Sequence, residues 1–409
     1  MRQLPKEAMR PFHVMAKPIS ATCNLQCSYC YYLSKEQLLV QRRGTRMAPA
    51  VLENYVRQYI DSQPGDEVTF IWQGGEPMML GLDFFREVVR LQAKYRRPGQ
   101  RIQNDLQTNG TLLDGPWCEF LKRCEFMLGL SIDGPAALHD AGRVDRRGHP
   151  TFDKVMAGAR LLQTHKIPFS TLTVVSRHNA HAAAEVYQFL TAELGSRSIQ
   201  LIPCVEPQGF THTAPQHWPA EDLPTVGEHA AVAAFVTKDS VTPQQWGDFL
   251  CGFFNCWTQD GLGRVMVNLF ESAVLQLLGY PALVCTSSEC CGSGVVLEHN
   301  GSVYACDHYV YPEYLLGNIG QRPLNALANS SLQEAFGRAK SGNLPTDCRR
   351  CPYLTLCWGE CPRNRFTRAP NGEAGLNYLC QGLRQFYAHA LPQLQKIAGV
   401  VARQHAGVA

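Results

Sequence analysis

The sequence predicts an α/β protein in which a parallel sheet, either open or closed into a partial barrel, precedes a small cysteine-rich domain. Two observations predict this fold. Extended apolar runs alternate with segments of helical periodicity from Phe12 to about Gln208, and cysteines concentrate from Cys285 onward. Such alternation is typical of parallel strands joined by right-handed crossovers. Six strand–helix units are fewer than the eight of a closed barrel.

Each unit of the sheet is defined by one apolar run and one amphipathic segment. The predicted strands are His13–Ile19, Val68–Gln73, Arg101–Thr108, Phe126–Ile132, Phe169–Val175 and Ser198–Val205. The predicted helices between them are Pro49–Ser62, Leu82–Arg96, Gly115–Arg123, Thr151–His165 and Asn179–Leu194.

Beyond the sheet, the pattern becomes less regular. We expect an irregular linker or lid over Pro207–Thr225, helices over Pro243–Gly261 and Val265–Leu278, and a hairpin that turns at Asn300-Gly301. The predicted domains are an N-terminal extension (1–11), the sheet-bearing core (12–225), a helical connector (226–284), the cysteine-rich domain (285–384) and a helical tail (385–409).

Composition excludes several classes of protein. Hydrophobic residues make up 45% of the 409 residues and charged residues 18%, as in ordinary globular proteins. The net charge of +3 is too small to indicate nucleic acid or an anionic membrane as a partner. No apolar run reaches the length of a membrane span, and the first residues lack the apolar core of a signal peptide. We therefore expect a cytoplasmic protein.

Seventeen cysteines are unusual for such a protein. A reducing cytosol disfavours structural disulfides, so the clustered cysteines are interpreted as metal ligands and the scattered ones as buried thiols. Cys23, Cys27 and Cys30 follow the first strand closely enough to surround one metal centre. Soft thiolates favour zinc, copper or iron–sulfur clusters, and three ligands leave one position open. The alternative, three apolar core residues, is opposed by the polar residues between them.

Small or polar residues follow the predicted strands, where an α/β sheet places its ligands. The motifs are Gln73-Gly74-Gly75-Glu76-Pro77, Gln107-Thr108-Asn109-Gly110, Ser131-Ile132-Asp133-Gly134 and Pro203-Cys204-Val205-Glu206. Any one of them could be an ordinary turn. Together they predict a binding site at the carboxyl edge of the sheet.

The CxxxCxxC spacing of the first three cysteines resembles that of radical S-adenosylmethionine (SAM) enzymes, in which a [4Fe–4S] cluster with an open iron chelates the cofactor. Gly74–Pro77 resembles the family's GGEP motif, whose backbone and acidic group hold the methionine amine. The C-terminal cysteines resemble the SPASM extension, which holds two auxiliary [4Fe–4S] clusters. A pair of zinc ribbons is the alternative, but it fits the upstream cysteines poorly.

Within this superfamily the sequence resembles anaerobic sulfatase-maturating enzymes. The resemblance runs from about Phe12 to Tyr387 and includes the segments 27–32, 72–77, 106–111, 129–135 and 304–308, and the pair His139 and Arg143. It implies a partial (β/α)6 radical SAM barrel followed by a cysteine-rich α+β SPASM domain, with S-adenosylmethionine and three [4Fe–4S] clusters as cofactors.

The resemblance also implies roles for individual residues. Cys23, Cys27 and Cys30 would hold the catalytic cluster, and the cofactor contacts would be Tyr29, Gly75, Ser131, Arg143 and Val205. One auxiliary cluster would use Cys285, Cys291, Cys306 and Cys361, with Cys290 as a substitute for Cys291. The other would use Cys348, Cys351, Cys357 and Cys380. The remaining cysteines are expected to be buried thiols: Cys118, Cys124, Cys204, Cys251, Cys256 and Cys290.

Asp307 matches the family's proposed general base, and His308 is a second candidate. Asp307 could instead be a turn aspartate that caps its own backbone. Gln73 and Tyr32 match positions that approach the peptide substrate.

The implied reaction is the oxidation of a cysteine or serine in a sulfatase to formylglycine (3-oxoalanine), after a deoxyadenosyl radical removes a hydrogen atom from Cβ. The implied partners are the sulfatase polypeptide, unfolded or nascent, and an electron donor such as flavodoxin or ferredoxin. Two alternatives remain: another SPASM enzyme that forms thioether or other crosslinks in a peptide, and a non-catalytic iron–sulfur or zinc-binding protein.

Overall fold

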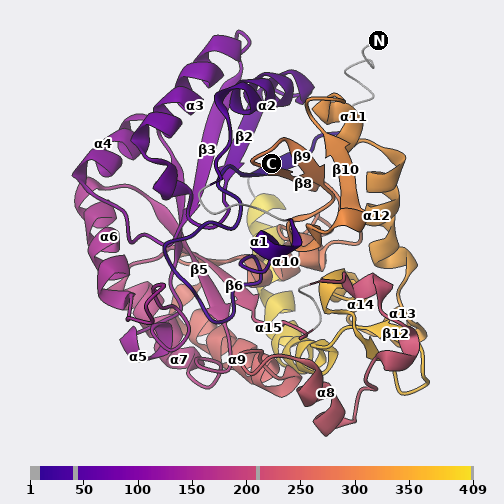
Figure 1. The fold of residues 1–409 in the computed structure, drawn as a ribbon. Coiled ribbons are helices and arrows are strands. Elements are labelled where there is room, and N and C mark those ends of the chain that lie inside the picture. Colours follow the sequence, from indigo (N-terminus) through magenta and orange to yellow (C-terminus); the bar gives the residue numbers. More distant parts are fainter. Residues whose placement is uncertain (1–9, 40–44, 209–211, 407–409) are drawn as a thin grey trace. The chain divides into compact units, whose positions relative to one another are not determined.

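The computed structural model describes residues 10–39, 45–208 and 212–406 (Figure 1). The chain forms two compact units that interleave along the sequence. The first comprises Met1–Ser131, Arg143–Phe169 and Gly292–Gly337, and the second comprises Ile132–Gly142, Ser170–Cys291 and Arg338–Ala409. The domain limits expected from the sequence remain a prediction.

The first unit contains strands in the order β10-β9-β8-β1-β2-β3-β4. Strands β1 (His13–Lys17), β2 (Glu67–Trp72), β3 (Arg101–Thr108) and β4 (Met127–Ser131) are parallel, and β8 (Gly294–Glu298) is parallel to β1. The hairpin strand β9 (Ser302–Tyr304) and β10 (Leu315–Asn318) continue the sheet in antiparallel fashion. The carboxyl ends of β1 to β4 therefore share one edge, where ligands of α/β sheets bind.

Helices of the first unit cover the parallel strands, with α2 and α3 packed together outside β2 and β3 (Figure 1). The helices of the first unit are α1 (Lys35–Leu38), α2 (Pro49–Ser62), α3 (Leu82–Tyr95), α4 (Gly115–Arg123), α6 (Phe152–His165) and α11 (Leu324–Ala328). Tyr55, Tyr59, Phe70, Trp72 and Phe85 form an aromatic core beneath them. Burial of these large rings holds the strand ends in a rigid frame.

The second unit contains the parallel strands β5 (Phe169–Val175), β6 (Ser198–Pro203) and β7 (Met266–Val267), and a small antiparallel pair, β11 (Thr367–Arg368) and β12 (Ala374–Leu376). Its helices are α5 (Ala136–His139), α7 (Ala183–Gln188), α8 (His229–Phe235), α9 (Pro243–Cys256), α10 (Asn268–Leu277), α13 (Thr346–Arg349), α14 (Leu354–Cys357) and α15 (Cys380–Ala406). Helix α12 (Ser331–Gly342) begins in the first unit and ends in the second. The π-helical turns are Phe189–Glu193 and Trp257–Gly261.

Four predicted elements have the bounds that the structure shows: Pro49–Ser62, Arg101–Thr108, Gly115–Arg123 and Phe169–Val175. The predicted hairpin turn is also confirmed, since Gly301 has a φ of 86° between β8 and β9.

Three predicted helices begin three or more residues away from the predicted position. The segment 265–278 begins as strand β7, because Val267 pairs with Ile199 before α10 starts. The segment 179–194 forms turns before α7 begins at Ala183. The tail helix starts at Cys380 rather than at Gln385. Among the described residues, no helix is both long and apolar enough to cross a membrane.

Candidate active site

The loop after β1 brings Cys23, Cys27 and Cys30 together. Burial, together with the charges of Glu76, Cys27 and Cys30, raises the pKa of Cys23 to about 12. Burial also raises the pKa of Cys30, although nearby backbone N–H groups and Arg143 oppose the change. Burial thus favours the protonated thiols of Cys23 and Cys30, and a bound metal would displace these protons.

The end of β3 anchors this loop. Asn109 donates from Nδ2 to Oδ1 of Asn24 at 2.9 Å, and Asn24 donates to Oγ1 of Thr111 at 2.8 Å. On the other side, Arg146 donates to the carbonyl oxygen of Cys23 at 2.6 Å, and Gln26 N donates to the carbonyl oxygen of Val144 at 2.8 Å. The loop is thus fixed by hydrogen bonds from two separate segments of the first unit.

The glycine motif after β2 lies directly against the start of the same loop. Gly75 N donates to the carbonyl oxygen of Ser20 at 2.5 Å, and Glu76 N donates to that of Thr22 at 2.9 Å. A Cβ atom at Gly75 would stand 1.9 Å from the Thr22 oxygen, which no side chain tolerates. Glycine is therefore required here by a close approach of two backbones.

Glu76 is completely buried at the junction of this motif with β3. Its carboxylate accepts hydrogen bonds from Asn109 N at 2.7 Å, Thr108 Oγ1 at 2.9 Å and Met78 N at 3.0 Å. Burial nevertheless raises its pKa to about 7, because it outweighs these donors. A cation bound nearby would return the pKa towards its usual range.

Other predicted cofactor contacts of the first unit lie close to the same loop. The guanidinium carbon of Arg143 lies 5.6 Å from the ring centroid of Tyr29, and its charge lowers the pKa of Cys30. Ser131 ends β4, and its hydroxyl accepts a hydrogen bond from Gln107 at 2.8 Å. In the second unit, Val205 is buried and its carbonyl oxygen accepts from Arg363 at 2.8 Å.

Asp307 lies in a buried polar cluster of the first unit. Lys17 Nζ is 2.6 Å from its Oδ1, and the Tyr31 hydroxyl donates to its Oδ2. Burial would raise the pKa of Asp307, but the charges of Lys17 and His308 and the bonds from Lys17 and Tyr31 lower it overall. The carboxylate is ionised and held at both oxygens.

Tyr32 and Gln73 border this cluster. Lys17 Nζ lies 4.3 Å from the Tyr32 ring centroid and 3.4 Å from Gln73 Oε1. The Tyr32 hydroxyl donates to the buried Glu298, and burial raises the pKa of Tyr32 well above its usual value. Tyr32 therefore acts here as a neutral hydrogen-bond donor.

The second unit holds two sets of thiols. In the first set, burial raises the pKa of Cys291 and of Cys361, and both thiols interact electrostatically with Cys285. The fourth expected ligand, Cys306, belongs to the first unit. Cys290 is exposed, with its sulfur 4.0 Å from Ser341 Oγ.

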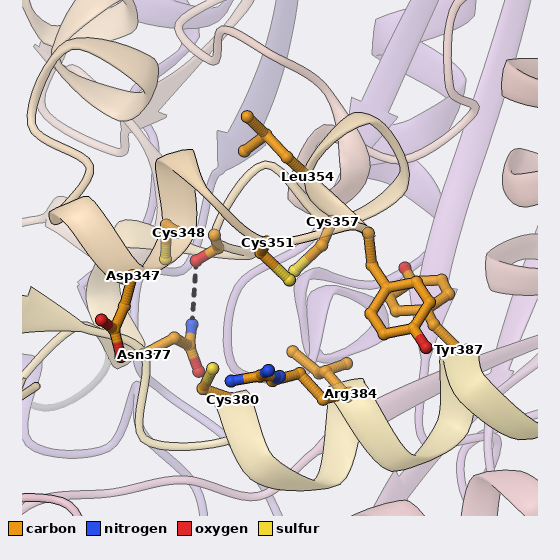
Figure 2. A pocket seen from close by; sticks show the side chains of 12 residues that line it. Asp347, Cys348, Cys351, Leu354, Cys357, Asn377, Cys380, Arg384 and Tyr387 are labelled. Carbon is orange, nitrogen blue, oxygen red and sulfur yellow. Dashed lines mark hydrogen bonds between the residues drawn. The ribbon is translucent and has the colours of Figure 1, made fainter. Parts of the chain in front are cut away.

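The second set lines a pocket (Figure 2). The pocket is lined by Cys348 of α13, Cys351 of the turn between α13 and α14, Cys357 at the end of α14 and Cys380 at the start of α15. Burial, together with the charges of Cys348 and Cys351, raises the pKa of Cys380 to about 12. Figure 2 also shows Arg384 and Tyr387 of α15 beside the thiols.

The donor sets fit iron–sulfur clusters in their chemistry, because clusters are held by cysteine thiolates. In the described ranges, no three Cys, His, Asp or Glu side chains converge as they would around a single ion. Thiolates of a [4Fe–4S] cluster stand farther apart, since each binds a different iron atom.

Comparisons with known proteins agree with this assignment. Residues 18–190 match the radical SAM superfamily, and residues 289–352 match SPASM, an iron–sulfur cluster-binding domain. A serine-type anaerobic sulfatase-maturating enzyme of Bacteroides thetaiotaomicron is 41% identical over 94% of this chain and 91% of its own length. The chain belongs to the anaerobic sulfatase-maturating enzymes.

Other members of this family give the same result. A cysteine-type enzyme of Clostridium perfringens is 32% identical over 95% of this chain and 99% of its own length. The solved structure of native anSMEcpe with bound AdoMet has a TM-score of 0.82 and 31% identity, and it covers 95% of this chain and 100% of that chain. The predicted family and fold class are therefore confirmed, and the chain is a radical SAM oxidoreductase.

Membership of the sulfatase-maturating family makes two residues of the Asp307 cluster notable, because the sequence did not single them out. Lys17 is the last residue of β1 and only 2% exposed, and Tyr31 follows Cys30, one of the predicted cluster ligands. Lys17 could have been recognised from the sequence, because it is a charged residue that directly follows the apolar residues of the first strand. The prediction of buried thiols is correct for Cys118 and Cys204 but wrong for Cys290, which lies in an exposed turn.

Proposed function

We propose that the protein oxidises a serine or cysteine side chain of a sulfatase to formylglycine. The observation that carries the proposal is the ionised Asp307, held by Lys17 and Tyr31 immediately after the cluster cysteine Cys306. When bound, S-adenosylmethionine and the clusters supply a radical that removes a hydrogen atom from the substrate Cβ, and a route for the departing electron.

The residues of the chain then have separate tasks. Cys23, Cys27 and Cys30 hold the catalytic cluster, while Gly75 and Glu76 form a cradle for the methionine end of S-adenosylmethionine. Tyr29, Ser131, Arg143 and Val205 complete its surroundings. Cys285, Cys291, Cys306 and Cys361 hold one auxiliary cluster, and Cys348, Cys351, Cys357 and Cys380 hold the other. The half-buried position of Cys291, whose thiol interacts electrostatically with Cys285, favours it over the exposed Cys290.

Asp307 accepts the proton of the substrate hydroxyl or thiol as the second electron leaves. From serine, the loss of two hydrogens gives the aldehyde directly. From cysteine it gives a thioaldehyde, which water converts to the aldehyde with release of hydrogen sulfide. Asp307 must be ionised to act, and Lys17 favours that state.

The substrate is a sulfatase polypeptide that is unfolded or nascent, and a flavodoxin or ferredoxin supplies the electron. A structure of anSMEcpe with AdoMet and the Cp18Cys peptide supports a peptide substrate. Serine should be tested first, because identity is higher to the serine-type relative (41%) than to the cysteine-type relative (32%). We place the protein in the cytoplasm.

The test is to incubate the reconstituted enzyme with S-adenosylmethionine, a reductant and a peptide that carries the sulfatase motif with serine or cysteine. We expect the serine peptide to lose two hydrogens and to gain an aldehyde that reacts with a hydrazine probe. A crosslinked product without an aldehyde would instead identify another SPASM-type reaction. An unchanged peptide, despite S-adenosylmethionine cleavage, would contradict the proposal.

A further inference from the structure

Lys340 of α12 is completely buried beside the first thiol set of the second unit. Its ammonium group donates to the carbonyl oxygens of Cys285 at 2.6 Å and Thr286 at 2.8 Å, and also to that of Ser288. A neutral amine has only two N–H groups, whereas these three acceptors need three. The geometry therefore requires the charged form of Lys340.

Arg365 is a second buried cation and is connected directly to the first. Its guanidinium donates to the carbonyl oxygen of Lys340 at 2.5 Å and to those of Trp358 at 2.7 Å and Gly359 at 3.0 Å. Trp358, Gly359 and Glu360 all have left-handed backbones, with φ values of 47°, 66° and 52°. Arg365 thus holds the tight turn that joins Cys357 of the second thiol set to Cys361 of the first.

Two cations in this position are costly unless negative charge lies nearby, because burial removes their hydration. The carbonyl oxygens that accept from Lys340 and Arg365 could equally be hydrogen-bonded by uncharged donors, so they do not by themselves explain two charged side chains here. The acidic groups that interact electrostatically with Lys340 are the thiols of Cys361, Cys285 and Cys291 and the half-buried carboxyl group of Glu360. Arg365 interacts electrostatically with Cys291 and Cys348, one from each set. A [4Fe–4S] cluster with its thiolates carries net negative charge, which these cations would balance.

We propose that Lys340 and Arg365 set the reduction potential of the auxiliary cluster assigned to Cys285, Cys291 and Cys361. Reduction adds one negative charge to a cluster, and a fixed positive charge close by stabilises the reduced form. The two residues therefore raise the potential and make this cluster a better acceptor for the electron that leaves the substrate. The role in electron acceptance rests on the proposed function, whereas the effect on the potential does not.

The experiment measures midpoint potentials by electron paramagnetic resonance during a redox titration of the full-length, reconstituted enzyme without peptide. Lys340→Gln removes the charge but keeps a hydrogen-bond donor, and Lys340→Arg keeps the charge. Lys396→Gln is the matched control, since it makes the same change at an exposed position of α15. We expect a more negative midpoint for one auxiliary cluster in Lys340→Gln alone, at unchanged iron and sulfide content. An unchanged midpoint in a Lys340→Gln enzyme that retains all its iron would overturn the proposal.

Arg365→Gln and Arg365→Lys extend the test if Lys340→Gln loses iron. We expect Arg365→Gln to shift the same midpoint in the same direction and Arg365→Lys to restore it. If Lys340→Gln and Arg365→Gln lose the cluster, the proposal requires Lys340→Arg and Arg365→Lys to retain it, with the midpoint potential of the wild type. If Lys340→Arg and Arg365→Lys also lose the cluster, both residues serve only to maintain the structure of the site, and the proposal is contradicted. Peptide oxidation by the wild type is measured separately, so failure of the proposed function leaves this result interpretable.

Discussion

The cysteine loop after β1 and the thiol sets of the second unit bring their thiols together in different ways. Cys23, Cys27 and Cys30 come from one short loop, held by backbone contacts and by Asn24 and Asn109. The thiols of the second unit come from segments far apart in the sequence, and buried Lys340 and Arg365 tie those segments together. The thiols of one loop are close together in the sequence, and neighbouring segments only fix the conformation of that loop. Thiols from distant segments come together only if long-range contacts hold those segments side by side.

This difference suits two different tasks. With the three proposed ligands Cys23, Cys27 and Cys30, a cluster in the loop would keep one position open for a ligand. The pocket of the second set has a full complement of four cysteines. A fully ligated cluster transfers electrons without binding substrate. Variants that affect one region and spare the other should therefore separate radical generation from electron transfer.

The largest expected effect comes from removing a thiol of the loop. Cys27→Ser should abolish S-adenosylmethionine cleavage and peptide oxidation together, because no cluster then binds the cofactor. Cys351→Ser should leave cleavage in place but lower peptide oxidation, because it affects only the second set. The measurements are release of deoxyadenosine and formation of the peptide aldehyde.

Cys290→Ser is the control for both variants, since Cys290 is exposed and assigned to no cluster. It should match the wild type in iron content and in both products. Continued cofactor cleavage by Cys27→Ser would refute the assignment of the loop.

The next largest effect is expected at the carboxylate of the first unit. Asp307→Asn keeps the shape of the side chain but cannot accept a proton, so peptide oxidation should fall by about 10²–10⁴-fold. Deoxyadenosine should still form, because hydrogen abstraction precedes proton transfer. His308→Gln is the comparison, and it should have the smaller effect. If His308→Gln proves the more harmful variant, the base is His308.

The contrast between the regions also explains what could be predicted from the sequence. The spacing of Cys23, Cys27 and Cys30 identified the loop because all its ligands are local. The glycine and amide motifs were recognised because they follow strands, and their positions at Gly75 and Asn109 agree with the structure.

Long-range partners could not be predicted in the same way. Lys17 and Asp307 are separated by most of the chain, and only the parallel pairing of β1 with β8 brings their segments together. Lys340 and Arg365 lie in segments without a recognisable motif, and their importance comes from burial beside thiols. The early start of α15 at Cys380 was also missed.

A smaller effect is expected where the glycine motif approaches the loop. Gly75→Ala forces its Cβ against the Thr22 carbonyl, so the loop must shift. We expect a loss of about 1–3 kcal/mol in the free energy of unfolding and weaker S-adenosylmethionine binding. Gly65→Ala is the matched control, because a Cβ there meets no atom within 4 Å. Thermal unfolding and equilibrium binding measure the two effects, and equal behaviour of both variants would contradict the tight cradle.

The smallest expected effect is the pH dependence of cofactor binding at Glu76. Its pKa is raised to about 7, so the carboxyl is protonated below that pH and ionised above it. The cationic methionine end of S-adenosylmethionine binds the ionised form better, so a proton must leave when the cofactor binds at lower pH. The dissociation constant should therefore rise as pH falls below 7, by up to about tenfold per unit.

Glu76→Gln removes the titrating group and should bind S-adenosylmethionine weakly with little dependence on pH between 6 and 8, in the range set by that pKa of about 7. The wild type should show the slope in calorimetric titrations and release about one proton per cofactor bound at pH 6. A slope of the same size in Glu76→Gln would contradict the assignment of the proton to Glu76.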